Sequence, residues 1–82
     1  APDGLIGQAR LARAAGDLPR AESLQQQAVA LVPGNAVVRI ELARILFLEG
    51  KTADAAEQLG FILQRYPGHP AAVELQTSIG GN

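Results

Sequence analysis

The chain alternates apolar, helix-patterned segments with short breaks rich in Gly and Pro. Within each segment the apolar residues recur every three or four positions, and no β-branched run competes with that spacing. The third segment is apolar around most of its circumference and is expected to be buried on more than one side. Residues 80–82 should fray. The pattern predicts five helices, over residues 5–15, 19–32, 36–49, 53–66 and 70–79.

The breaks contain recognisable start and stop signals. Gly16 and Gly50 interrupt the first and third segments, and Pro19 suits the first turn of a new helix. The stretches "VPGN" and "YPGH" should stop the second and fourth helices, because Pro cannot continue the ladder and Gly tolerates a left-handed turn. Asn35 and Thr52 are expected to cap the helices that follow.

This punctuation repeats at a constant interval. The pair Pro33-Gly34 returns 34 positions later as Pro67-Gly68. The same shift aligns five further pairs: Ile6 with Ile40, Ala9 with Ala43, Arg10 with Arg44, Gly16 with Gly50, and Ala21 with Ala55. A helix–turn–helix unit at this period predicts a stack of similar helical hairpins.

On these residues the chain resembles the tetratricopeptide repeat (TPR) family over nearly all of its length. The family pattern asks for two small residues where the paired helices touch, Gly at the turn within the repeat and Pro at its end. Small residues let two antiparallel helices approach to about 8–10 Å. The two repeats supply them as Ala9 and Ala43, Ala21 and Ala55, Gly16 and Gly50, and Pro33 and Pro67.

The resemblance implies an all-α fold, an antiparallel helix-hairpin solenoid forming a single domain over residues 1–82. Repeat one is expected at about 2–35, repeat two at about 36–69, and a C-terminal capping helix at about 70–79. The chain departs from the family pattern at four positions, which predict a looser first repeat and a fourth helix farther from its partner. Leu5, Arg39 and Gln25 replace aromatics, and Ile62 replaces Ala.

The resemblance also implies that the first helix of each repeat lines a concave groove for a peptide. Arg10 and Arg44 are equivalent residues that would address carboxylates, while apolar neighbours supply contact area. The alternative is that these arginines solvate the surface or pair with Glu41 and Glu49. The predicted groove residues are Ile6, Arg10, Arg13, Ile40, Glu41, Arg44 and Phe47.

The family's clamp for a C-terminal carboxylate is not matched, because Ile6, Arg10 and Glu41 stand where it has Lys and Asn. Binding of that kind is therefore not expected. Phe47 and Leu48 are interpreted either as a ligand anchor or as core against the fifth helix.

Three further features of the sequence are an aromatic residue, a polar run and the single histidine. Phe61 is expected on the outward surface, either as a second contact patch or as a scattered aromatic. The run Gln25–Gln27 is interpreted as a solvated helix face. His69, the single histidine, precedes a helix start as a cap or a tolerated residue and has no metal partner.

Composition narrows the function. Seven Lys and Arg against eight Asp and Glu give no electrostatic footprint for nucleic acid or an anionic membrane. No apolar run approaches the ~18 residues of a membrane span. The lack of Cys removes disulfides and thiolate metal sites and fits cytoplasm and periplasm equally. No nucleophile–base pair, glycine-rich phosphate loop or buried carboxylate pair predicts catalysis or a cofactor.

These observations predict a non-enzymatic module that binds a protein or peptide partner. The alternative is a structural spacer or self-associating segment of a longer repeat array, and hence a homo-oligomer. Six Arg to one Lys is typical of a high-GC bacterium, and the absence of Met predicts a segment of a longer protein. The run "VRIELARILFLEGKTADAAEQL" is similar to modules of bacterial envelope-assembly proteins.

Overall fold

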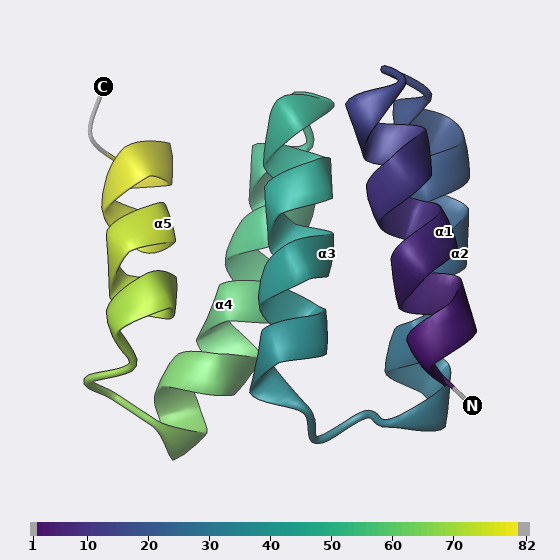
Figure 1. Ribbon diagram of the computed structural model, residues 1–82. Coiled ribbons are helices and arrows are strands. Elements are labelled where there is room, and N and C mark those ends of the chain that lie inside the picture. Colours follow the sequence, from purple (N-terminus) through teal and green to yellow (C-terminus); the bar gives the residue numbers. More distant parts are fainter. Residues whose placement is uncertain (1, 81–82) are drawn as a thin grey trace.

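A computed structural model describes residues 2–80 of the chain, and all regular secondary structure in this range is α-helical. Figure 1 shows the helices side by side, with the α1–α2 hairpin at one end, α3–α4 in the middle and α5 at the other end. The predicted all-α helical-hairpin solenoid is confirmed. The helices are α1 (Pro2–Ala14), α2 (Leu18–Leu31), α3 (Ala36–Leu48), α4 (Thr52–Arg65) and α5 (Pro70–Gly80).

The two turns within the hairpins are built identically around a glycine with positive φ. Gly16 has φ 82° and Gly50 has φ 81°, a region that costs residues with a Cβ about 1–2 kcal/mol. In the first turn, the Asp17 N–H donates to the Ala12 carbonyl at 2.8 Å, and Lys51 N–H donates likewise to Leu46 at 2.8 Å. This is the Schellman arrangement, which satisfies the last carbonyls of α1 and α3.

The turns between α2 and α3 and between α4 and α5 are of a different kind. The Asn35 N–H donates to the Val32 carbonyl at 3.0 Å, and His69 N–H donates to Tyr66 at 3.0 Å, closing four-residue turns. Gly34 has no positive φ, so the expectation of a left-handed glycine there was wrong. Pro at the second position already fixes φ for such a turn, and glycine is not required at the third.

Three helix starts are capped by side chains. The Asn35 side chain accepts from the Val38 N–H at 3.1 Å, as predicted. Asp17 accepts from the Arg20 N–H at 3.4 Å ahead of α2, and His69 Nδ1 from the Ala72 N–H at 3.5 Å ahead of α5.

Two expected helix boundaries were wrong. Thr52 was expected to cap α4 but is its first residue, and Lys51 precedes it without a side-chain cap. The first helix begins at Pro2 rather than at residue 5, because Pro is well suited to a first turn. Gly80 was expected to fray but is the last residue of α5. Residues 81 and 82, which were also expected to fray, lie outside the described residues.

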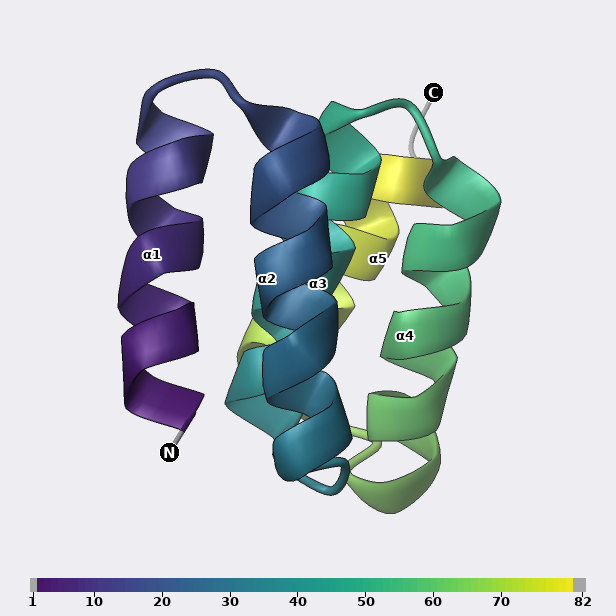
Figure 2. The same cartoon turned by 90° about the vertical axis from the view of Figure 1, so that its right-hand side faces the viewer.

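Two buried clusters hold the hairpins together. One lies in the first hairpin and includes Ile45 of α3, which reaches across to α1 and α2. The other joins α3, α4 and α5. The alanines at the helix contacts are almost completely buried: Ala9 at 1%, and Ala21, Ala43 and Ala55 at 0% exposure. In Figure 2, α2 lies in front of α3, the contact through which the first hairpin packs on the second.

Candidate protein-binding surface

The seam between α1 and α3 is marked by an ion pair. Arg13 Nη1 of α1 donates to Glu41 Oε2 of α3 at 3.4 Å, with the two side chains 33% and 18% exposed. One helical turn from each partner, on the same side of its helix, lie Arg10 and Arg44. We call seven residues along this seam the α1–α3 face. Four are exposed (Arg10, Val37, Arg44 and Leu48) and three are half-buried (Ile6, Arg13 and Glu41).

The two equivalent arginines of this face behave differently from Arg13. Arg10 and Arg44 are exposed, and within residues 2–80 neither makes an ion pair. Of the alternative interpretation, the pairing half applies to Arg13 alone, which pairs with Glu41, whereas the exposure of Arg10 and Arg44 also fits the other half, solvation of the surface. Two guanidinium groups remain available to an outside carboxylate.

The apolar residues expected beside these arginines have different surroundings. Ile40 is 4% exposed and belongs to the core, so its placement on the surface was wrong. Phe47 is half-buried and packs against the cluster that includes Ala72 of α5, as the core interpretation predicted, but the same interpretation was wrong for Leu48, which is 58% exposed. Ile6 is also half-buried.

Two exposed apolar side chains take the place of Ile40. Val37 and Leu48 are each 58% exposed and stand on the side of α3 that carries Glu41 and Arg44. Val37 was missed in the sequence, although its spacing of four from Glu41 and seven from Arg44 places it on that side.

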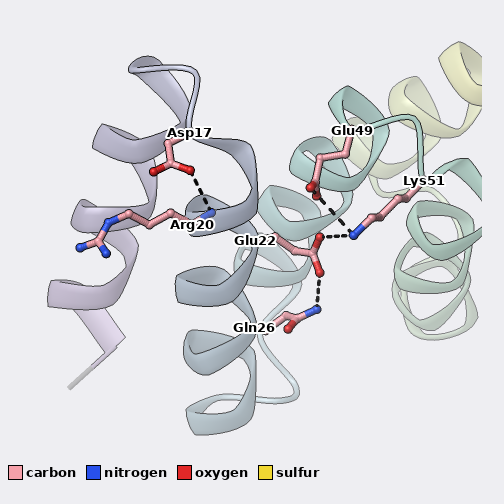
Figure 3. Close-up of polar contacts among 6 residues, drawn as sticks. All are labelled: Asp17, Arg20, Glu22, Gln26, Glu49 and Lys51. Carbon is pink, nitrogen blue, oxygen red and sulfur yellow. Dashed lines mark hydrogen bonds and ion pairs between the residues drawn. The ribbon is translucent and has the colours of Figure 1, made fainter.

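A second polar cluster lies where α2 meets the turn between α3 and α4. Figure 3 shows Lys51 Nζ at 2.8 Å from Glu22 Oε1 and at 3.9 Å from Glu49 Oε2. The neighbouring Glu22 carboxyl, followed by burial, raises the pKa of Glu49; the Glu49 carboxyl and the hydrogen bond from Lys51 lower the pKa of Glu22. One Glu49 oxygen, Oε1, is buried without a hydrogen-bond partner. The cluster ties the first hairpin to the second.

Phe61 is half-buried and lies between two arginines, so its interpretation as a scattered surface aromatic was wrong. The guanidinium carbons of Arg39 and Arg65 lie 3.7 and 3.8 Å from its ring centroid. Arg39 also donates to the Pro33 carbonyl at 2.7 Å and to Gln58 Oε1 at 3.0 Å. Burial, and then the nearby Arg65, lower the pKa of Arg39. Arg39 thus ties α3 to α4 at the position where the family pattern has an aromatic.

Gln25 is buried rather than solvated. It is 1% exposed, and its Nε2 donates to the Val38 carbonyl at 3.0 Å, whereas Gln26 and Gln27 are exposed. The 34-residue shift holds the signal for this, because Gln25 is equivalent to the fully buried Leu59. The expectation of a solvated run was wrong at its first residue.

Residues 2–80 enclose no pocket and hold no group of three or more acidic or histidine side chains suited to a metal ion. No helix in this described part has the length and apolar character to cross a bilayer.

Comparison with known proteins assigns the chain to a family. The tetratricopeptide repeat model matches residues 12–79, beginning inside α1. That family generally provides protein–protein interaction modules, and its repeats are typically non-catalytic. No curated protein and no solved structure matches the chain significantly. Because the family match covers most of the sequence, the chain belongs to the tetratricopeptide repeat family.

Proposed function

We propose that the α1–α3 face binds a segment of a partner protein that carries acidic side chains. The observation that carries this proposal is the pair Arg10 and Arg44, exposed, equivalent in the repeat and without an ion-pair partner within residues 2–80. A charge-assisted hydrogen bond to a carboxylate contributes about 1.5–3 kcal/mol when the pair is shielded from water. Two such contacts would fix the position of a bound segment.

The partner segment also carries apolar side chains. Val37 and Leu48 flank Arg44 on α3 and are each 58% exposed. They lie 11 residues apart, which is about 16 Å along a helix. This spacing suits a segment with apolar residues on either side of an acidic one. The Arg13–Glu41 ion pair lies beside them and limits where a second carboxylate is accepted.

Two sets of labelled peptides of equal length test the proposal. In the acidic set Glu alternates with Leu, and in the second set Lys replaces every Glu. We expect the full chain to bind the acidic set. The double variant Arg10→Glu, Arg44→Glu should bind that set at least tenfold more weakly, a loss of about 1.4 kcal/mol. Fluorescence anisotropy measures the affinity, and circular dichroism checks that the variant remains helical. Arg20→Glu is the matched control, since Arg20 is an exposed arginine on α2.

Equal binding by the double variant and by the Arg20→Glu control would remove the α1–α3 face from the mechanism. Capture of partner proteins by pull-down with the same variants extends the test to natural partners.

In the proposed division of the chain, residues 2–35 and 36–69 are the two repeats and 70–79 the closing helix. We place the module in a larger bacterial, envelope-associated assembly protein.

A second candidate function is structural, in which the chain is a spacer or self-associating scaffold. The observation that favours it is the exposure of leucines away from the α1–α3 face, with Leu11 at 73% and Leu31 at 56%. Sedimentation velocity at several concentrations separates self-association from the spacer role. A monomer at every concentration would contradict self-association, whereas a dimer would support it.

A further inference from the structure

Two arginines cover opposite faces of one aromatic ring in the second hairpin. The guanidinium carbons of Arg39 on α3 and Arg65 on α4 lie 3.7 and 3.8 Å from the Phe61 ring centroid. If both groups lay over the same face, their atoms would overlap, so the ring separates them. The two carbons are therefore at most about 7.5 Å apart, the sum of the two distances. We call these three residues the arginine sandwich.

The positive charge of the arginine sandwich is not balanced by acidic side chains. Within residues 2–80 the ion pairs involve Arg13 and Lys51, and neither Arg39 nor Arg65 takes part in one. Glu57, one helical turn before the ring on α4, is exposed and pairs with neither. Burial, and then the charge of Arg65, lower the pKa of Arg39, because both disfavour its charged form. An anion bound between the two guanidinium groups would offset their repulsion.

The guanidinium groups are held in place and keep donors for a ligand. Arg39 Nε donates to the Pro33 carbonyl at 2.7 Å, and its Nη1 donates to Gln58 Oε1 at 3.0 Å. Arg65 Nη1 donates to the Phe61 carbonyl at 3.5 Å. A guanidinium group has five N–H donors, so each arginine retains several. Because Arg39 is already fixed by these contacts and by the ring, little of its freedom is lost on binding.

The repeat does not require the arginine sandwich for its folding. The residues 34 positions earlier are Leu5, Gln27 and Leu31, none of which is charged. Leu5 packs against the core of the first hairpin, and Leu31 is 56% exposed. The first hairpin thus forms the same two helices and the same glycine turn with uncharged side chains at these positions.

We propose that the arginine sandwich is a phosphate-binding site, with the phosphate group at the edge of the Phe61 ring and contacted by both arginines. A phosphorylated side chain carries about two negative charges at neutral pH and three acceptor oxygens, enough for two guanidinium groups. The fork of a guanidinium group matches phosphate oxygens, and the edge of an aromatic ring is its positive region. A carboxylate has a single charge and two oxygens, so it is the weaker ligand.

This site is separate from the α1–α3 face. Arg39 lies two positions from both Val37 and Glu41 on α3, which places it on another side of that helix. The proposal therefore goes beyond the binding of an acidic segment at Arg10 and Arg44 and does not rest on it. A phosphate group reaches the site either on a phosphorylated side chain of a peptide or as the free ion.

Nuclear magnetic resonance of the full chain tests the proposal through the Nε–H signals of its arginines. Sodium phosphate, added at pH 7.5 with sodium chloride keeping the ionic strength constant, should shift the Arg39 and Arg65 signals along a saturable curve. Three labelled peptides that differ only in a central phosphoserine, serine or glutamate provide the second arm. The phosphoserine peptide should bind about tenfold more tightly than the glutamate peptide. If it also binds more tightly than free phosphate, the ligand is a phosphorylated side chain, and equal affinities identify the free ion.

Matched variants locate the site. Arg65→Gln should weaken phosphate binding about tenfold, and Arg65→Lys should recover only part of that loss, because lysine keeps the charge but lacks the planar fork. Arg20→Gln and the double variant Arg10→Gln, Arg44→Gln should leave phosphate affinity unchanged, and circular dichroism checks that every variant remains helical. The absence of a saturable shift, or equal phosphate affinities of Arg65→Gln and Arg20→Gln, would overturn the proposal. Loss of phosphate binding in the double variant would also overturn it, because the ligand would then lie on the α1–α3 face.

Discussion

Gln25 of α2 donates a 3.0 Å hydrogen bond from its side-chain amide to the carbonyl oxygen of Val38 in α3. The contact crosses the boundary between the two hairpins, and the Gln25 side chain is 1% exposed. A buried amide is tolerated only where its polar atoms find partners. The junction of the hairpins therefore includes a polar contact that the apolar pattern of the sequence does not reveal.

Replacement of Gln25 tests the importance of this contact. Gln25→Ala should lower the free energy of unfolding by about 2 kcal/mol, because it leaves a cavity and removes the hydrogen bond. Gln25→Leu, which copies the equivalent Leu59, should recover most of that loss. Urea unfolding measures both, with Gln27→Ala as the exposed neighbouring control. Equal effects of Gln25→Ala and Gln27→Ala would contradict the prediction.

The two kinds of turn predict opposite responses to alanine. Gly50→Ala should destabilise the protein by about 1–2 kcal/mol, because alanine must adopt the positive φ of 81°. Gly34→Ala should be neutral or stabilise by a few tenths of a kcal/mol, since Gly34 has no positive φ and a Cβ there meets nothing within 4 Å. Thermal unfolding compares the two variants. A larger loss at Gly34 than at Gly50 would contradict the prediction.

The stacking of Arg39 and Arg65 on Phe61 predicts an energetic coupling. Phe61→Leu keeps an apolar side chain but removes the ring, and we expect a loss of about 1–2 kcal/mol from two cation–π contacts. A double-mutant cycle with Arg39→Gln should give a coupling energy of about 0.5–1 kcal/mol. The cycle with Arg20→Gln should be additive. Additivity in both cycles would mean that the stacking contributes nothing measurable.

The carboxylate pair predicts a pH-dependent effect of Glu49→Gln. The pKa of Glu49 is raised in the folded protein. Its contribution to the free energy of unfolding is therefore fully present below the ordinary glutamate pKa, about 4.3, and is lost as the pH rises through the folded-state pKa. The ionised form beside Glu22 is therefore the unfavourable one. Glu49→Gln should raise the melting temperature at pH 7, and its advantage should disappear near pH 4, where Glu49 is itself protonated.

Glu22 provides the matched comparison, because its pKa is lowered by the neighbouring Glu49 carboxyl and by the hydrogen bond from Lys51. Its stabilising contribution is present above the ordinary glutamate pKa and is lost as the pH falls through the folded-state pKa. Glu22→Gln should therefore lower the melting temperature at pH 7 and have a smaller effect at low pH. Parallel pH profiles for the Glu22 and Glu49 variants would contradict the assignment.

Local features of the fold were predictable because they depend on residues close in sequence. Gly16 and Gly50 were predicted as breaks, and both terminate a helix with positive φ. The cap of Asn35 on Val38 was predicted for the same reason, since donor and acceptor are three residues apart. The start of α4 was placed incorrectly because a threonine fits both the capping position and the first turn.

The candidate surface was only partly predictable. Helical spacing places Arg10 and Arg44 on matching sides of their helices, and both are exposed. The same spacing left Ile40 ambiguous, because α3 packs on α2, α4 and α5 and its buried sector extends to that residue. Which of the apolar residues of α3 remain exposed depends on α2 and α5 together, and no local pattern specifies both.

By itself, the sequence determined the five helices, their glycine turns and the 34-residue repeat, because hydrogen-bond ladders and backbone sterics act over a few residues. Only the tertiary structure decided that Gln25 is buried, that Phe61 lies between two arginines and that Leu11 is exposed while Ile45 is covered. Each of these depends on which helix lies opposite. That arrangement is fixed by packing between residues far apart in the chain.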